Sequence, residues 1–170
     1  MKKLSILFIL LTIIIPIFAQ SEINNIIIDE MSDEEMLLGH CDREGLSSVP
    51  FNMWFEPEYE NYEVDNEILD QISAESMDNM NIKIVLGTWC SDSQREVPRF
   101  YKMMDYLDFT DFEVIAVNRA KLAENTEVDD LYVDFVPTFI FYKNGQEIGR
   151  IIESPEESLE KDMVNILASN

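Results

Sequence analysis

An alternation of short apolar runs with helical patterns in the second half of the chain constrains its fold more than any other feature. The run Ile82–Gly87 is short, apolar apart from Lys83 and rich in β-branched residues, which is typical of a buried strand. Apolar residues recur at helical spacing over Ser91–Leu107, and a second apolar run follows at Phe112–Val117. Because strands that alternate with helices pair in parallel, the pattern predicts an α/β domain.

The last part of the chain predicts an antiparallel hairpin and a helix. Phe139–Tyr142 and Glu147–Ile152 have strand character, and the Asn144-Gly145 pair between them favours a tight turn. Ser154-Pro155-Glu156-Glu157 has the composition of a helix start, with serine as the cap and acidic residues at the positive end of the helix dipole. Lys121–Tyr132 is expected to be helix or loop. Because the earlier strands are predicted to be parallel and the hairpin antiparallel, the sheet is expected to be mixed.

The segment 20–64 is acidic and irregular, and we treat it as an N-terminal extension of a domain that spans 65–170. The isoleucines of 23–31 fit a short amphipathic helix, and a further helical turn is expected to end at Gly39. Apolar residues over 65–80 also suit a helix.

An aromatic stretch over 51–62 has two interpretations, a partner-binding surface or a segment that packs on its own domain. Pro50 suits the first turn of a helix, and Pro57 is expected to keep Glu56 out of helical conformation.

The charge balance excludes several function classes. The 170 residues include 12 Lys and Arg against 34 Asp and Glu, for a formal net charge of −22. Such a chain repels phosphate, so we expect no nucleic-acid partner and no binding to an anionic membrane surface. With two cysteines and one histidine, neither a disulfide-rich scaffold nor a histidine-based metal site is available, and we expect no metal or other cofactor.

Residues 1–19 have the pattern of a secretory signal peptide. Lys2 and Lys3 precede the apolar run Leu4–Phe18, and Ala19 provides a small residue before a mature start at Gln20. An uncleaved N-terminal anchor is the alternative interpretation. We therefore expect an exported, periplasmic or secreted protein in a compartment that permits disulfides.

The chemistry is expected where the first predicted strand meets its helix, at Thr88-Trp89-Cys90-Ser91-Asp92-Ser93. Unpaired backbone N–H groups at a helix start stabilise a thiolate, which is the form of cysteine that attacks disulfides. Asp92 opposes that effect, whereas Arg95 and Arg99 favour the thiolate if they face it.

Four motifs in this order resemble the thioredoxin family over residues 65–168. They are Trp89-Cys90, Pro98 eight residues after the cysteine, Val136-Pro137-Thr138, and Phe141-Tyr142-Lys143-Asn144-Gly145. The resemblance implies a three-layer, thioredoxin-like fold with a mixed central sheet flanked by helices. It also implies that Cys90 is exposed at the carboxyl edge of a central strand, opposite a cis-proline loop at Pro137. The activity implied is thiol–disulfide exchange with protein or small-molecule thiols and disulfides.

The departures from the family pattern matter for mechanism. Ser93 replaces the second cysteine of the redox pair, Ile84 replaces a buried acid, and Glu153-Ser154-Pro155 replaces a glycine after the last strand. Since a serine hydroxyl forms no disulfide, Cys90 is expected to act as a single thiol in mixed-disulfide or isomerase-type chemistry. The alternative is a redox-inactive module that holds an extended peptide through the 136–138 loop and the aromatic stretch.

Cys41, within His40-Cys41-Asp42, has three interpretations. It is a resolving thiol or disulfide partner for Cys90, an unpaired structural cysteine, or part of a metal site. A bridge to Cys90 closes a loop of about 50 residues, worth roughly 4 kcal/mol in the chain-entropy model. The sequence leaves the oligomeric state open.

Overall fold

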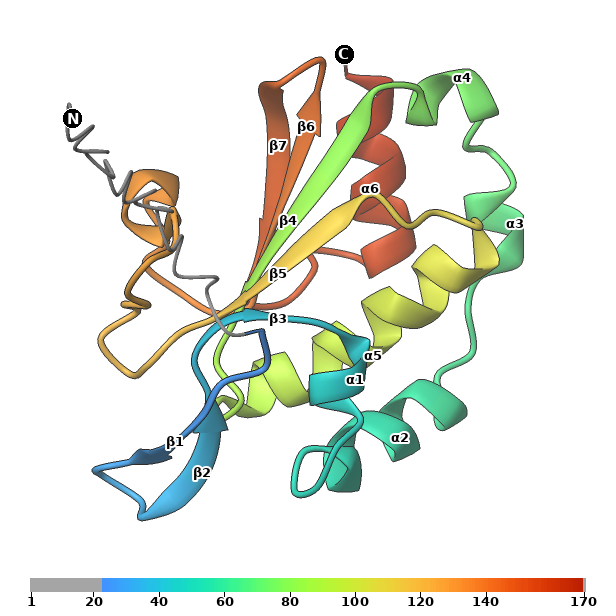
Figure 1. Cartoon of the computed structure of the whole chain (residues 1–170). Helices are drawn as coiled ribbons and strands as arrows, with labels where there is room; N and C mark the ends of the chain where they lie inside the picture. Colours follow the sequence, from blue (N-terminus) through green and yellow to red (C-terminus); the bar gives the residue numbers. More distant parts are fainter. Residues whose placement is uncertain (1–22, 170) are drawn as a thin grey trace, which may run out of the picture.

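The structure, a computed structural model, describes residues 23–169, and a five-stranded mixed sheet forms its centre (Figure 1). In sheet order the strands are β3 (Gly39–Cys41), β5 (Phe112–Ala116), β4 (Met80–Leu86), β6 (Thr138–Lys143) and β7 (Gln146–Ile152). β4 and β5 are parallel, and all other neighbours are antiparallel. The predicted signal peptide lies outside the described residues.

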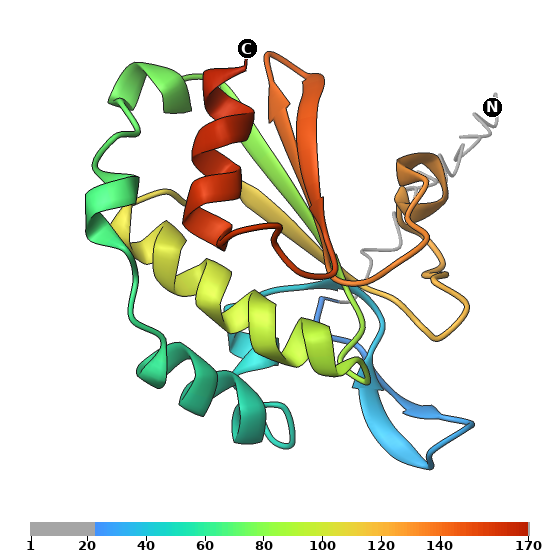
Figure 2. The ribbon, with the colours of Figure 1, turned by 180° about the vertical axis from the view of Figure 1, so that it is seen from behind.

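Helices cover one face of this sheet. They are α1 (Arg43–Leu46), α2 (Asn52–Asn61), α3 (Asn66–Leu69), α4 (Ala74–Met77), α5 (Ser91–Tyr106) and α6 (Leu159–Ala168). α5 and α6 lie against the sheet, α2 packs on α5, and α3 packs on α6 (Figures 1 and 2). The segment with the 3-10 helix η1 (Val128–Leu131) covers the opposite face.

The core consists of two apolar clusters separated by the sheet. Alternate side chains of β4 enter different clusters, so Ile84 packs with Phe100 of α5 while Val85 packs with Ile115 and Leu131. Ile84 and Val85 are both fully buried. Burial of each such side chain contributes about 1.5–3 kcal/mol, which explains why apolar residues dominate the strand, with Asn81 and Lys83 at its partly exposed positions.

The unit β4-α5-β5, followed by the β6–β7 hairpin and α6, confirms the predicted thioredoxin-like α/β fold with a mixed sheet flanked by helices. The hairpin turns at Asn144 and Gly145, whose φ angles are 52° and 77°. Two successive positive φ values are the geometry for which an Asn-Gly pair is favoured.

The helix predicted over 23–31 is wrong. Residues Ile26–Asp29 form β1, which pairs with β2 (Glu34–Leu37) in a separate antiparallel hairpin. Three consecutive isoleucines favour a strand, and Asp33 adopts a φ of 59° that a turn accommodates. β3, an antiparallel edge strand, was likewise not predicted.

Several helix boundaries also differ from the prediction. α2 continues through Pro57, where the missing N–H removes a single helix bond and packing on α5 maintains the helix. The helix expected over 65–80 is divided, because Ser73 caps a new helix and Met80 already belongs to β4. α6 is capped by Ser158 and not by Ser154, since the Asp162 carboxylate accepts the Glu156 and Glu157 N–H groups in a preceding loop.

Residues 23–64 share the core of the rest of the chain. Leu37, Leu46, Phe51 and Phe55 are at most 2% exposed and belong to the cluster that contains Phe100. The aromatic stretch of α2 therefore packs on its own domain, which supports the second of its two interpretations.

Candidate functional site

Cys90 lies at the junction of β4 and α5, in the N-cap position of the helix. Its backbone is extended, with φ −98° and ψ 125°, and its N–H donates to the Gly87 carbonyl at 2.9 Å. The side chain is partly exposed and is a free thiol. The start of a 16-residue helix therefore directs unpaired N–H groups toward the region of this sulfur.

The loop before β6 lies directly against the thiol. Cys90 Sγ donates to the carbonyl oxygen of Val136 at 3.2 Å, across 46 residues of sequence. The Val136–Pro137 peptide bond is cis. Thr138 Oγ1 donates to the Phe135 carbonyl at 2.7 Å, and the Pro137 carbonyl accepts from Glu153 N at 2.7 Å. These bonds hold both ends of the loop.

Trp89 is fixed beside Cys90 by three contacts. Its Nε1 donates to the Val117 carbonyl at 2.9 Å, and the guanidinium carbon of Arg119 lies 4.9 Å from the ring centroid. The ring also covers Gly87 so closely that a Cβ there would lie 2.6 Å from a Trp89 ring carbon. A glycine is thus required by this close approach.

The β1–β2 hairpin is bonded to the site through four residues, of which the sequence analysis identified only Thr88. Arg119 Nε donates to the buried carboxylate of Asp29 at 2.6 Å, and Leu37 N donates to Thr88 Oγ1 at 3.2 Å. Burial opposes ionisation of Asp29. Hydrogen bonds from Met31 N, Arg119 and Ser32, together with the charge of Arg119, outweigh burial and lower the pKa of Asp29.

Ser93 is fully buried and points inward. Its Oγ accepts a hydrogen bond from the backbone N–H of Gly87 at 3.2 Å. One turn of helix separates it from Cys90. The serine thus stabilises the strand-to-helix turn on which Cys90 stands.

The arginines of α5 pair with carboxylates of α5 itself and of α2. Arg95 bonds Asp92 at 2.8 Å and Glu96 at 2.6 Å, while Arg99 bonds Glu58 at 2.9 Å. The sequence left open whether Arg95 and Arg99 face the thiol, and in the structure both guanidinium groups are engaged by carboxylates. Asp92 in turn is neutralised locally by Arg95.

The structure does not bring Cys41 to Cys90. Both thiols are free, and Cys41 is 5% exposed within the cluster on the α5 face, while Cys90 packs against the opposite cluster. Burial and, to a smaller extent, the charge of Asp42 raise the pKa of Cys41 to about 12. A backbone hydrogen bond at Ala116 has the opposite, weaker effect. The candidate resolving thiol is therefore a buried, protonated cysteine in this structure.

The neighbours of Cys41 have other partners. His40 Nε2 lies 3.6 Å from Glu127, and the Asp42 carboxylate caps α1 by accepting from Gly45 N at 3.1 Å. Within residues 23–169, no group of three or more His, Cys, Asp or Glu side chains is arranged to hold a metal ion. Over the same range, no helix has the length and apolarity needed to cross a membrane.

Two curated proteins resemble part of the chain. Thioredoxin H2-1 from Oryza sativa subsp. japonica is 32% identical over 84 residues, which is 49% of this chain and 57% of that protein. A thioredoxin-like protein from Acanthamoeba polyphaga mimivirus is 30% identical over 77 residues, or 45% of this chain and 55% of its own. The matched part thus spans little more than half the length of these relatives. No protein-family model matches the chain.

Among solved structures, thioredoxin from Fasciola hepatica is 17% identical with a TM-score of 0.40, over 59% of this chain and 89% of that one. A Pseudomonas aeruginosa protein of unknown function has a TM-score of 0.45 at 14% identity, over 69% and 79% of the two chains. These likenesses are partial, and the fold assignment rests on the sheet topology of this chain.

Proposed function

We propose that this chain is a thiol–disulfide exchange protein that acts through Cys90 as a single thiol. One observation carries the proposal: a free, partly exposed cysteine caps α5 with its sulfur 3.2 Å from the Val136 carbonyl of the Pro137 loop. The similarity to proteins named thioredoxin supports the same chemistry.

The reaction needs no external oxidant or reductant, because one disulfide bond breaks as another forms. The Cys90 thiolate attacks one sulfur of a substrate disulfide, a Cys90–substrate disulfide forms, and the other substrate sulfur leaves as a thiolate that takes up a proton. A second thiol, from the substrate protein or from a small molecule, then attacks the mixed disulfide and releases Cys90. Because position 93 is a serine, no neighbouring residue of the helix start performs that second step.

The surrounding residues have supporting roles in this proposal. The helix start stabilises the thiolate, Trp89 shields one side of the site, and the 136–138 loop borders the sulfur. When the thiol loses its proton, the Val136 carbonyl loses a donor and becomes free to accept a substrate N–H.

The direct test is formation of a mixed disulfide with oxidised glutathione or the neutral reagent 4,4′-dithiodipyridine, followed by intact mass. We expect one adduct on the native protein, its loss in Cys90→Ser, and its retention in Cys41→Ser. Absence of an adduct on folded wild-type protein would overturn the proposal.

The burial of Ser93 favours a second candidate, a redox-inactive module that binds an extended peptide beside the 136–138 loop. A hydroxyl that bonds the Gly87 N–H serves the scaffold and contributes no redox chemistry. If Cys90→Ser abolishes mixed disulfides but leaves the affinity for a client peptide unchanged, and no thiol-dependent turnover is found, this candidate replaces the first.

We further propose that the protein is exported, on the basis of the sequence pattern of 1–19 alone. Expression in a host with an envelope, fractionation and N-terminal sequencing of the product provide the test. The expected result is a mature chain that starts at Gln20 outside the cytoplasm. A cytoplasmic chain that retains Lys2 and Lys3 would contradict it.

A further inference from the structure

We infer that an apolar groove beside Cys90, edged by two carboxylates, binds a segment of substrate polypeptide that carries Lys or Arg side chains. The inference rests on the proposed function and names its substrate class. The substrates are polypeptides that contain a disulfide and carry Lys or Arg residues close to it in sequence.

The groove lies between the β1–β2 hairpin and the start of α2 and has a volume of about 390 Å³. Pro50, Phe51, Met53 and Trp54 form its apolar part. Phe51 is buried and fixed, whereas the Met53 side chain is 78% exposed. An exposed methionine in such a groove offers an adaptable apolar contact for a bound chain.

The groove ends at the turn that carries Cys90. Thr88 and Gln94 line this end, on either side of the cysteine in sequence. Gln94 Nε2 donates to the Thr88 carbonyl at 2.7 Å, and Gln94 N donates to the Cys90 carbonyl at 3.0 Å. Cys90 is not itself among the lining residues, and its Sγ bonds the Val136 carbonyl, so a polypeptide in the groove reaches the thiol by continuing past Thr88 and Gln94. Figure 2 shows the hairpin, the start of α2 and the start of α5 gathered at this end of the molecule.

The charge at the groove is negative and uncompensated. Glu34 and Glu35 of β2 line it and are exposed, and neither carboxylate has an ion-pair partner among residues 23–169. Arg95 of α5 and Arg119, which lies over the Trp89 ring, are both already paired with carboxylates.

These features select the chemistry of the occupant. A Lys or Arg side chain lays its methylene stem on Met53 and Trp54 while its charged end reaches Glu34 or Glu35. An acidic segment is repelled by the same carboxylates and by the net charge of −22. The groove is thus expected to attract a cationic client and to reject an anionic one.

The experiment compares two peptides that carry the same disulfide, one flanked by lysines and one by glutamates. The rate constant for mixed-disulfide formation at Cys90 is measured by quench and mass spectrometry at low and high salt. We expect the cationic peptide to react about 10-fold faster at low ionic strength, and the difference to shrink as salt screens the charges.

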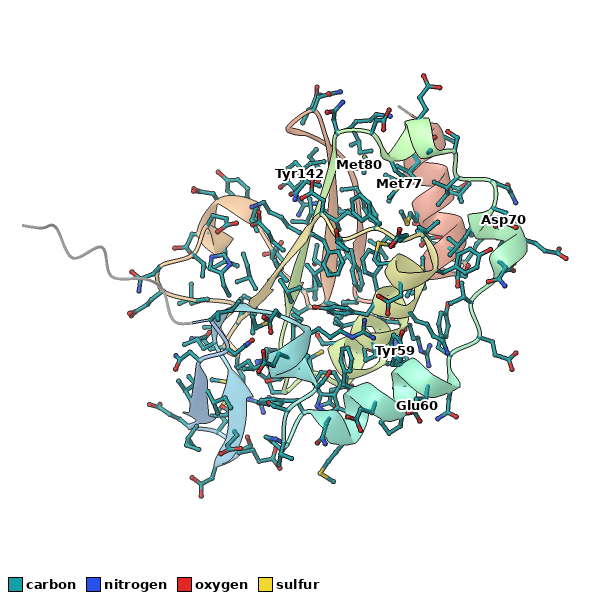
Figure 3. The ribbon with its side chains drawn as sticks, turned by 45° about the vertical axis from the view of Figure 1, so that its right-hand side comes forward. Tyr59, Glu60, Asp70, Met77, Met80 and Tyr142 are labelled. Atoms are coloured by element: carbon teal, nitrogen blue, oxygen red, sulfur yellow. The ribbon has the colours of Figure 1, made fainter. Side chains whose placement is uncertain are left out.

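The matched variants change the same charge at two places. Glu34→Gln with Glu35→Gln is expected to reduce the preference several-fold, whereas Glu60→Gln with Glu63→Gln is expected to leave it unchanged. Glu60 lies at the other end of α2, far from the hairpin (Figure 3). Met53→Ser is expected to slow both peptides, since it removes apolar contact without changing charge.

A neutral small disulfide separates the two levels of the proposal. If 4,4′-dithiodipyridine labels Cys90 but the peptides react equally, or if the two double variants have equal effects, the groove inference is overturned and the exchange function stands. If Cys90 of the folded protein reacts with no disulfide, the proposed function fails and the inference fails with it.

Discussion

The buried hydroxyl of Ser93 accepts the backbone N–H of Gly87 at 3.2 Å, and this bond ties α5 to the end of β4. Gly87 is itself buried, with the Trp89 ring against its Cα, so this hydrogen bond lies in the interior. Ser93, which stands where the two-cysteine motif has its second thiol, is therefore held by a structural hydrogen bond to Gly87.

The first prediction concerns stability. Ser93→Ala leaves the Gly87 N–H without a partner in the interior, which should lower the free energy of unfolding by about 1–3 kcal/mol. Urea denaturation followed by circular dichroism measures the change. Ser91→Ala, at an exposed position of the same turn, is the control and should have a much smaller effect. Equal effects of the two substitutions would contradict a structural role for the Ser93 hydroxyl.

The second prediction concerns turnover. Ser93→Cys places a second thiol one helical turn from Cys90, within the range at which disulfides close. The variant should reduce a model protein disulfide in repeated cycles with a dithiol donor, while wild type stalls as a mixed disulfide. Ile84, where the family has a buried acid, is expected to make the gain partial.

Two controls accompany this measurement. Cys90→Ser in the Ser93→Cys background should abolish reduction, and Cys41→Ser in that background should leave it intact. A folded Ser93→Cys protein with both thiols accessible and no reductase activity would show that Cys90 is poorly activated, and would favour the binding module.

Local sequence patterns predicted those elements whose structure depends mainly on residues close together in the sequence. The β4-α5-β5 unit and the β6–β7 hairpin follow from apolar periodicity and the Asn144-Gly145 pair, and the motif around Cys90 located the strand–helix junction. The β1–β2 hairpin was missed because the same isoleucines fit one turn of a helix, and only pairing with β2 decides between them.

The supporting contacts of the site were beyond local prediction. Arg119 and Asp29 are 90 residues apart in sequence, and nothing in either segment indicates the other. The same holds for Cys41, whose pairing with Val114 in the sheet buries it away from Cys90. Gly87 carried a detectable signal, since a glycine two residues before a tryptophan at a strand end permits close packing of the ring.

The third prediction separates the two thiols. Because burial raises the pKa of Cys41 to about 12, roughly one thiol in 10⁴ is ionised near pH 8, and the side chain is also 5% exposed. Iodoacetamide should therefore modify only Cys90 in the native protein, and both cysteines after denaturation. Peptide mapping by mass spectrometry identifies the sites. Native labelling of Cys41 at a rate comparable to Cys90 would mean that β3 opens readily.

The last prediction concerns the attachment of the β1–β2 hairpin. The pKa of Asp29 is lowered in the folded protein despite burial, because the Met31 N–H, Arg119 and Ser32 bond the carboxylate. The unfolded chain titrates near its ordinary value of about 3.9, so this contribution to stability is present at neutral pH and is lost as the pH falls through the folded value. Asp29→Asn should therefore lower the free energy of unfolding at neutral pH, and the difference from wild type should narrow toward about pH 3.

Urea unfolding at the two pH values measures this difference, and Asp33→Asn, at an exposed turn position of the same hairpin, is the control. A gap of equal size at both pH values would mean that Asp29 contributes through shape alone and that its ion pair with Arg119 does not stabilise the hairpin against the site.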